Sequence, residues 1–148
     1  MMIYKRSLIV LLFLMSVGNT QNWTWMHGDN TYSTNTSTDR YGDWGTKGVA
    51  ASSNVPSARY SSISWIDKDG NLWLFGGLAY LNSTNSTYAS NDLWKYDVSE
   101  NKWTWMSGSS DGNQTGTHGT KGTAASSNIP GARNAGVSWI DTNNDLWL

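Results

Sequence analysis

The two histidines, His27 and His118, are the side chains of this sequence best suited to acid–base or metal chemistry near neutral pH. A histidine that binds a metal or takes part in catalysis needs partner side chains at ligand spacing, and neither histidine has such a partner nearby. Cysteine is absent, which excludes a thiolate nucleophile, a disulfide framework and a cysteine-based zinc site. We therefore expect both histidines in solvent-exposed loops. We assign no catalytic residue, no cofactor-binding residue, no metal ligand and no cofactor to this sequence.

Two polar stretches resemble ion-binding loops but lack the elements that such loops need. Residues 67–71 (DKDGN) begin like a calcium loop, yet an EF-hand has flanking helices and a Glu at its twelfth position, where this sequence has Leu78. Residues 45–48 (GTKG), with a copy at 119–122, resemble a phosphate-binding loop, but no helix N-terminus follows to supply a dipole. We interpret the first stretch as a hairpin turn and the second as a structured loop.

The charge of the chain argues against nucleic acid as a partner. The formal net charge is −1, and 14% of the residues are charged. The ten Lys and Arg residues are scattered singly, apart from Lys5-Arg6. A nucleic-acid surface would instead cluster them to neutralise phosphates.

Residues 1–20 have the order of a secretory signal peptide. Lys5-Arg6 form a basic start, residues 8–15 (LIVLLFLM) are an unbroken apolar run, and small or polar residues follow. Cleavage after Gly18 or after Thr20 fits these residues, and an uncleaved anchor is the alternative. The apolar run is too short to span roughly 30 Å of hydrocarbon as a helix, which takes about 20 residues. We predict a secreted, extracellular protein with no membrane span in this sequence.

Five Asn-X-Ser/Thr triplets agree with export, because such triplets are acceptors for N-glycosylation in secreted proteins. None of them has Pro in the middle position. The acceptors are Asn22, Asn35, Asn82, Asn85 and Asn113.

The rest of the sequence contains an internal repeat. The matching pairs are WTWM at 23–26 and 103–106, GTKGVAASSNVPSAR at 45–59 and GTKGTAASSNIPGAR at 119–133, and SWIDKDGNLWL at 64–74 and SWIDTNNDLWL at 138–148. The last two pairs are offset by 74 positions. Three matching stretches in the same order predict one structural unit that occurs more than once.

Within one unit the sequence predicts four strands. Residues 60–66 alternate with a period of two, and residues 72–75 form a continuous apolar run that we expect to be buried on both faces. Residues 93–96 and 103–106 complete the unit, with long loops at 78–91 and 107–131. No stretch of the mature region has the 3.6-residue apolar period of a helix. The sequence therefore predicts an all-β fold.

The pattern of Gly76-Gly77 after the second strand, followed by Tyr96 and Trp103 across the last turn, resembles the motif of kelch repeats. Kelch repeats build β-propellers, in which four-stranded blades surround a central channel. The resemblance covers residues 23–148 and implies a partial kelch-type β-propeller at 21–148, with these four residues as its structural motif positions. One departure is the spacing of the copies, since about 50 residues is usual for a kelch repeat.

The resemblance also implies how the strands divide among blades. Residues 23–26 are then a lone fourth strand, residues 58–106 a complete blade and residues 133–148 the first half of the next blade. Propellers usually close with four to eight blades, so we expect an N-terminal fragment of a longer chain. Assembly of short chains into a propeller as homo-oligomers is the alternative. We expect Trp103, Trp105 or both to pack between adjacent blades.

The leading hypothesis for function is a secreted kelch β-propeller that serves as a protein- or glycan-binding scaffold. The alternative is a galactose-oxidase-like carbohydrate enzyme whose catalytic residues lie beyond Leu148. Galactose oxidase is a member of the kelch family whose copper chemistry uses a Tyr crosslinked to a Cys, and this sequence has no Cys. A third hypothesis is a lectin-like role in which exposed Trp or Tyr side chains stack on sugars.

Overall fold

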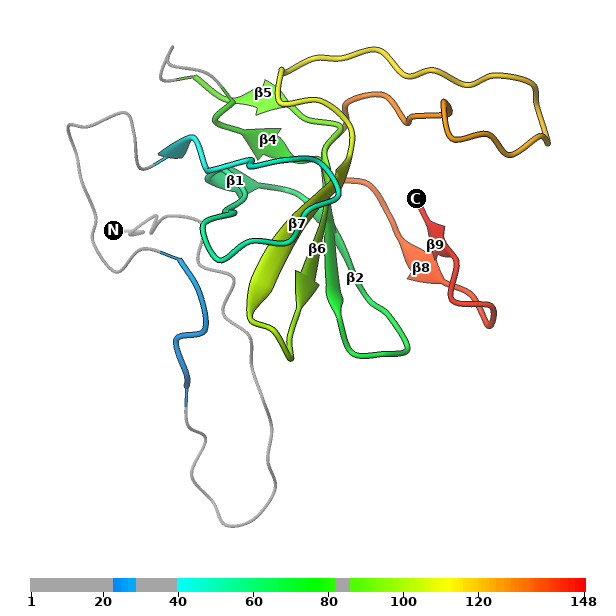
Figure 1. Ribbon diagram of the computed structural model, residues 1–148. Coiled ribbons are helices and arrows are strands. Elements are labelled where there is room, and N and C mark those ends of the chain that lie inside the picture. The colour runs from blue at the N-terminus through cyan, green and yellow to red at the C-terminus, as the bar shows by residue number, and fades with distance from the viewer. Residues whose placement is uncertain (1–22, 29–39, 82–85) are drawn as a thin grey trace.

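The computed structural model describes residues 23–28, 40–81 and 86–148, which form short antiparallel strands joined by turns and loops (Figure 1). The predicted all-β class is confirmed, since this part of the chain contains no α-helix. The strands are β1 (Arg59–Tyr60), β2 (Ile63–Ile66), β3 (Leu72–Phe75), β4 (Leu78–Ala79), β5 (Tyr88–Ala89), β6 (Leu93–Asp97), β7 (Lys102–Ser107), β8 (Trp139–Ile140) and β9 (Leu146–Trp147).

The centre of the structure is a four-stranded antiparallel sheet in the order β2-β3-β6-β7. β3 has the predicted bounds, while β6 and β7 extend slightly beyond theirs. The turn between β2 and β3 is a tight one in which Gly70 has a φ of 83°, as the sequence predicts.

The predicted first strand, residues 60–66, is wrong at its beginning. Ser61 has a φ of 56°, a left-handed backbone conformation that interrupts an extended chain. Of the predicted strand, only residues 63–66 (β2) therefore join the four-stranded sheet. Tyr60 pairs instead with Leu78 of β4.

The stretch predicted as a long loop at 78–91 contains two paired strands. β4 pairs with β5 on one side and with β1 on the other, which gives a three-stranded sheet in the order β1-β4-β5. This small sheet lies at the end of the four-stranded sheet from which the loop at 107–131 also emerges (Figure 1). Its strands are two residues long. Such a strand is too short to produce a recognisable alternation in the sequence.

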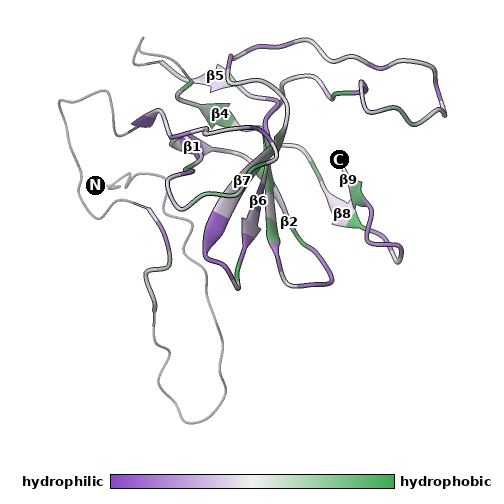
Figure 2. Cartoon of the chain, in the orientation of Figure 1, coloured by the Kyte–Doolittle hydropathy of each residue, from purple (hydrophilic) through white to green (hydrophobic). Residues whose placement is uncertain are grey.

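Both faces of β3 are apolar and both are covered, as predicted from its continuous apolar run. Successive side chains of a strand point to opposite faces, so Leu74 and Phe75 enter different clusters. The cluster on one face comprises Leu74, Trp94, Tyr96 and Trp103, and the cluster on the other comprises Ile63, Trp65 and Phe75. Figure 2 shows the loop at 107–131 as largely hydrophilic, with hydrophobic residues on β2, β4 and β9.

The second copy of the repeat packs against the first through the hairpin β8–β9. Trp139 pairs with Trp147 in this hairpin, as Trp65 pairs with Trp73 between β2 and β3. The indole N–H of Trp65 donates to the backbone oxygens of Trp139 and Trp147, at 3.1 Å each. Leu146 packs against the cluster that contains Phe75. The hairpin of the second copy therefore covers one face of the first.

Gly76 and Gly77 lie where the chain of the second copy comes close to β3. Their φ values are 61° and 97°, which glycine adopts without the strain of a Cβ. The N–H of Gly77 donates to the backbone oxygen of Arg133 at 2.9 Å. A Cβ on Gly76 would lie 2.5 Å from that same oxygen. The two copies can therefore approach this closely because no side chain stands between them.

Alanine at Gly76 should destabilise the protein more than alanine at Gly70, whose φ is also positive but whose Cβ would meet nothing within 4 Å. We expect Gly70→Ala to lower the free energy of unfolding by about 1–2 kcal/mol through backbone strain alone. Gly76→Ala should lower the free energy of unfolding by about 1–3 kcal/mol more than Gly70→Ala does, because its Cβ overlaps the backbone of the second copy. Urea denaturation followed by tryptophan fluorescence measures both. Equal losses would show that the second copy does not constrain Gly76.

Candidate binding surface

The four residues of the kelch-like motif are buried, Tyr96 and Trp103 within the four-stranded sheet and Gly76 and Gly77 directly after β3. Tyr96 and Trp103 are opposite each other on β6 and β7, with ring centroids 5.0 Å apart, and each is 3% exposed. Gly76 and Gly77 follow β3 at the other end of the sheet, since Tyr96 pairs with Leu72 at the beginning of β3. The structure therefore separates the two pairs, and neither forms a surface for a ligand.

Arg59 and Asp92 form a buried ion pair that was not predicted from the sequence. The side chains are 2% and 0% exposed, and the guanidinium binds both carboxylate oxygens, with Nη1–Oδ1 at 2.7 Å and Nη2–Oδ2 at 2.6 Å. The remaining N–H groups donate to the backbone and hydroxyl oxygens of Ser57 and to the backbone oxygen of Gly76, all at 3.1 Å. All five N–H donors of the guanidinium thus have an acceptor.

The carboxylate of Asp92 is also fully bonded. The hydroxyl of Ser90 donates to Oδ1, and the indole N–H of Trp94 donates to Oδ2 at 2.6 Å. A buried ion pair is tolerated only when its remaining hydrogen bonds are satisfied in this way. The pair therefore fixes β1, the end of β3 and the beginning of β6 relative to one another. The sequence contained a signal for one partner only. Arg59 recurs as Arg133 in the second copy, whereas Asp92 lies outside the repeated stretches.

The turn that resembles a calcium loop is organised by the carboxylate of Asp67. Its Oδ1 accepts hydrogen bonds from the backbone N–H groups of Asp69 (3.0 Å) and Asn71 (2.8 Å), and its Oδ2 accepts one from the indole of Trp73 (2.9 Å). Burial by itself raises the pKa of Asp67, but these hydrogen bonds outweigh burial and hold the pKa below its ordinary value. The carboxylate is thus an internal acceptor of the hairpin turn.

The prediction that both histidines are exposed is wrong for His27. Its ring is partly buried and meets the edge of Tyr96, with centroids 6.1 Å apart. Burial lowers the pKa of His27, although a hydrogen bond with the backbone of Ser52 acts in the opposite direction. His118 is exposed, as predicted. In the described part of the chain, no group of three or more His, Cys, Asp or Glu side chains is arranged to hold a metal ion.

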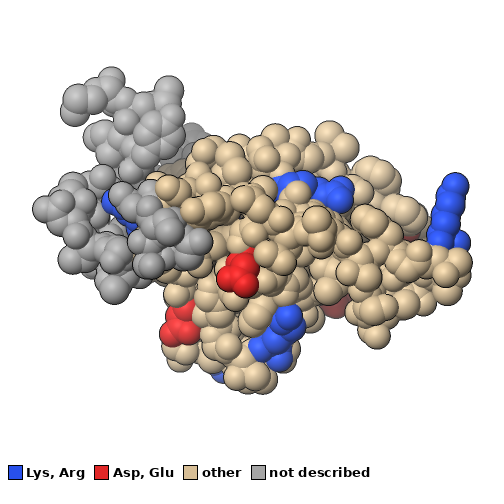
Figure 3. All heavy atoms as spheres, turned by 90° about the horizontal axis from the view of Figure 1, so that it is seen from above, with Lys and Arg blue, Asp and Glu red and all other residues tan. Residues whose placement is uncertain are grey.

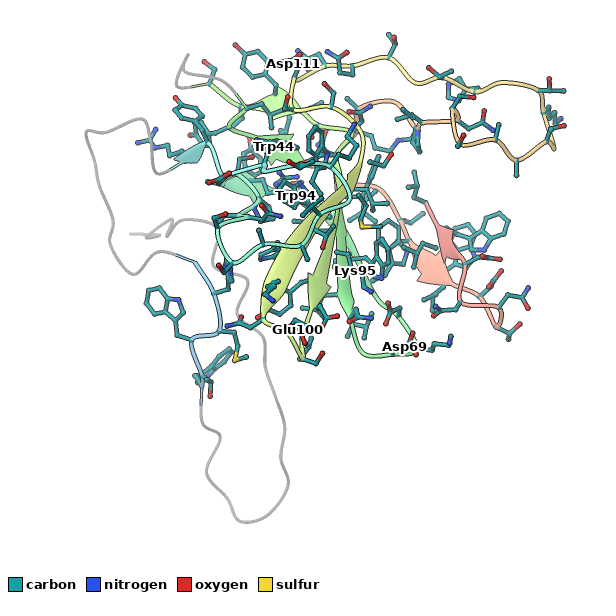
Figure 4. All side chains as sticks on the ribbon, in the orientation of Figure 1. Trp44, Asp69, Trp94, Lys95, Glu100 and Asp111 are labelled. Atoms are coloured by element: carbon teal, nitrogen blue, oxygen red, sulfur yellow. The ribbon has the colours of Figure 1, made fainter. Side chains whose placement is uncertain are left out.

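Residues 43–55, which we call the first loop, run along β7. The ring of Trp44 packs on Trp94 and Trp105, with centroids 5.0 and 4.9 Å apart (Figure 4). Lys47 within the GTKG stretch donates from Nζ to the backbone oxygen of Gly108 at 2.8 Å. The stretch is therefore the structured loop that the sequence predicts. The two tryptophans of β7 contact this loop and β6, and their packing between adjacent blades stays a prediction.

The two ends of the four-stranded sheet differ in their surfaces. The turns at 67–71 and 98–101 lie at one end, and the three-stranded sheet and the loop at 107–131 lie at the other (Figure 1). Asp69 and Glu100 belong to the first end and Asp111 to the second (Figure 4). The visible surface of the second end carries few, well-separated charged side chains among uncharged residues (Figure 3). This end, which we call the loop end, offers a largely neutral polar surface.

The structure locates one of the five predicted glycosylation acceptors. Asn113 is exposed at the loop end, and its Oδ1 accepts a hydrogen bond from the N–H of Ala89 at 3.2 Å. The acceptors Asn22, Asn35, Asn82 and Asn85 and the predicted signal peptide at 1–20 lie outside the described residues. Glycosylation at all five positions stays a prediction.

Trp139 and Trp147 form an exposed aromatic pair on the second copy. Their rings are stacked with centroids 5.8 Å apart and an interplanar angle of 4°, and they are 53% and 47% exposed. Exposed apolar patches of this kind mark interaction sites. In the first copy the equivalent of Trp139 is Trp65, which is only 6% exposed because the hairpin β8–β9 covers it. The pair therefore resembles a contact surface between consecutive units.

Comparison of the chain with models of protein families, with curated proteins and with solved structures found no match. No helix of sufficient length and apolar character to cross a membrane occurs in the described ranges. The interpretation of function therefore rests on the sequence motif and on the geometry above.

Removing the charge of Asp92 should cost far more stability than removing an exposed charge. Asp92→Asn leaves the guanidinium of Arg59 buried without its counter-charge, and we expect the free energy of unfolding to fall by about 3–5 kcal/mol. Glu100→Gln is the control, because Glu100 pairs with Lys102 at 3.1 Å but is 63% exposed. Glu100→Gln should lower the free energy of unfolding by less than about 1 kcal/mol. Thermal and urea denaturation measure both variants, and similar losses would contradict the central role of the buried pair.

The lowered pKa of Asp67 predicts a loss of stability in acid. Because the pKa is lower in the folded state than in the unfolded state, the stabilisation is complete above the ordinary value of 3.8 and is lost as the pH falls through the folded value. Asp67→Asn should lower stability at neutral pH and weaken the decline in acid. Asp69→Asn, which removes an exposed carboxylate from the same turn, should retain the decline of the wild type. Urea midpoints from pH 7 to pH 2 test this, and identical profiles for all three proteins would refute it.

Proposed function

We propose that this chain forms part of a secreted β-propeller of the kelch type and that the propeller is a scaffold that binds a protein or a glycan. The observation that carries this proposal is the packing of two consecutive copies of one unit. The indole of Trp65 in the first copy bonds to both strands of the hairpin in the second, and Leu146 of that hairpin packs on the cluster of Phe75.

A propeller explains why the unit is repeated. A four-stranded antiparallel sheet with apolar side chains on both faces needs a neighbour on each face. Repetition around a central axis supplies such neighbours and leaves only short, protected edges. The order of strands in the first unit, β2-β3-β6-β7, is the order of a propeller blade. The motif residues Gly76, Gly77, Tyr96 and Trp103 agree with the kelch variety of this architecture.

We infer that the loop end is the binding surface of the scaffold. Loops held by a rigid sheet frequently carry function, and residues 113–115 are exposed on the long loop at this end. The surface is neutral and rich in hydroxyl and amide groups, which suits hydrogen bonding to a glycan or to a polar protein surface. The opposite end presents two short turns whose polar groups bond largely within the turns, as those of Asp67 and Asp97 do.

Screening on a glycan array and on an array of extracellular proteins tests this proposal. We expect at least one ligand to bind, and Gln114→Ala combined with Thr117→Ala, two exposed residues of the loop end whose replacement retains the acceptor triplet of Asn113, should weaken that binding by about ten-fold, the effect of one or two lost hydrogen bonds. Lys68→Ala combined with Asp69→Ala at the turn end is the matched control and should leave binding unchanged. Equal loss in both double variants would contradict a binding surface at the loop end.

A further inference from the structure

The tripeptide Asp-Gly-Asn occurs twice in the sequence, at 69–71 and at 111–113. An Asp-Gly step rearranges without an enzyme where the backbone nitrogen of the glycine reaches the carboxyl group of the aspartate, because glycine has no side chain to hinder that approach. Both Asp69 and Asp111 are exposed. The surroundings of the two glycine nitrogens therefore decide which step reacts.

The step at Asp69 is held in the hairpin turn between β2 and β3. The N–H of Gly70, whose nitrogen would have to attack, donates to the backbone oxygen of Asp67 at 2.9 Å. The N–H groups on either side, those of Asp69 and Asn71, donate to the carboxylate of Asp67 at 3.0 and 2.8 Å. An attack by the nitrogen of Gly70 would break its own hydrogen bond and distort the turn.

The step at Asp111 lies in the loop after β7 and lacks such a restraint. Within the ranges that the structure describes, the carboxylate of Asp111 bonds to no other group, and the N–H of Gly112 donates to no acceptor. The N–H of Asp111 itself donates to the hydroxyl of Ser109 at 3.0 Å, which does not hold the glycine. Figure 4 shows Asp111 at the loop end, above the four-stranded sheet.

The residues that follow Asp111 are fixed to β5 of the first unit. The N–H of Asn113 donates to the backbone oxygen of Ala89 at 2.7 Å, and its Oδ1 accepts from the N–H of Ala89 at 3.2 Å. Asn113 thus pairs with Ala89 as a neighbouring strand would and caps the outer edge of β5. Gly112 lies against Tyr88, where a Cβ on the glycine would overlap the Cβ of the tyrosine.

We propose that Asp111 is a site of spontaneous isomerisation to isoaspartate and that the hairpin turn protects Asp69. The backbone nitrogen of Gly112 attacks Cγ of Asp111 and closes a succinimide ring. The carboxyl hydroxyl leaves as water together with the proton of that nitrogen.

One molecule of water then opens the ring, so the overall change is an isomerisation without oxidant, reductant or enzyme. Addition of water at Cγ restores aspartate. Addition at the backbone carbonyl of Asp111 breaks the bond between that carbonyl and the nitrogen of Gly112. The main chain then runs through Cβ and Cγ of Asp111, and the new carboxylate lies on its Cα.

Isoaspartate at position 111 loosens the cap on β5. The main chain becomes longer by one methylene group immediately before Gly112, which has no room to move toward Tyr88. The two hydrogen bonds between Asn113 and Ala89 are therefore displaced. The edge of the three-stranded sheet loses its cap, and its backbone N–H and C=O groups become available to other partners.

Ageing of the purified full chain in heavy-oxygen water at neutral pH tests the proposal. Peptide mapping by mass spectrometry with electron-transfer fragmentation distinguishes isoaspartate from aspartate at each position. We expect isoaspartate at position 111 with one heavy oxygen atom incorporated. Asp69 should react about ten-fold more slowly, the rate effect of one hydrogen bond that must first break.

Synthetic peptides of residues 65–74 and 107–116 are the matched controls, because they contain the same tripeptide without the fold. Both peptides should isomerise at similar rates. Asp111→Ala, which removes the reacting carboxyl group, controls for other effects of ageing. Hydrogen exchange at the amides of Ala89 and Asn113 should become faster in the aged wild type and stay unchanged in aged Asp111→Ala.

Equal rates at positions 69 and 111 of the folded chain, or an absence of isoaspartate at position 111, would overturn the proposal. Isoaspartate that contains no heavy oxygen would overturn the succinimide route. A peptide of 65–74 that reacts as slowly as Asp69 in the folded chain would show that the sequence, and not the turn, protects this residue. Unchanged exchange at Ala89 and Asn113 after ageing would overturn the loss of the cap on β5.

Discussion

The structure depends on a sheet that is apolar on both of its faces. β3 places Leu74 on one face and Phe75 on the other, so neither face is stable in water and each needs a cover. The first loop covers one face with the ring of Trp44, and the hairpin of the second copy covers the other. The unit therefore does not complete its own core. It requires chain from before it and from after it, which is the reason that a repeated sequence accompanies this fold.

The buried ion pair of Arg59 and Asp92 lies where these covers meet. Its carboxylate accepts the indole N–H of Trp94, a member of the first cluster, and its guanidinium donates to Gly76, beside which the second copy passes. An ion pair that excludes water in this way contributes less to net stability than to fixing one arrangement, because each alternative packing leaves a charge without its partner. We regard it as the element that orders the three-stranded sheet against the four-stranded one.

The sequence predicted those features whose signal is carried by several neighbouring residues. The continuous apolar run of 72–75 identified β3, and the repeat identified the hairpin of the second copy. The break at Ser61 and the strands β4 and β5 were missed, because one left-handed residue and two-residue strands leave no periodic pattern. The pairing of Arg59 with Asp92 was missed for another reason. The two residues are 33 positions apart, and only the folded chain brings them together.

The two loops show that this protein forms its recognition elements locally. The first loop contacts a strand, and its copy at 117–129 contacts no strand among the described residues, yet their internal hydrogen bonds and glycine φ values agree. The docked strand therefore does not impose the conformation. Asn54 and Asn128 do so, each bonding to the backbone within its own loop and each with its Oδ1 close to a glycine at which a Cβ would collide with it. A loop ordered in this way holds its strand without a further loss of conformational entropy within the loop.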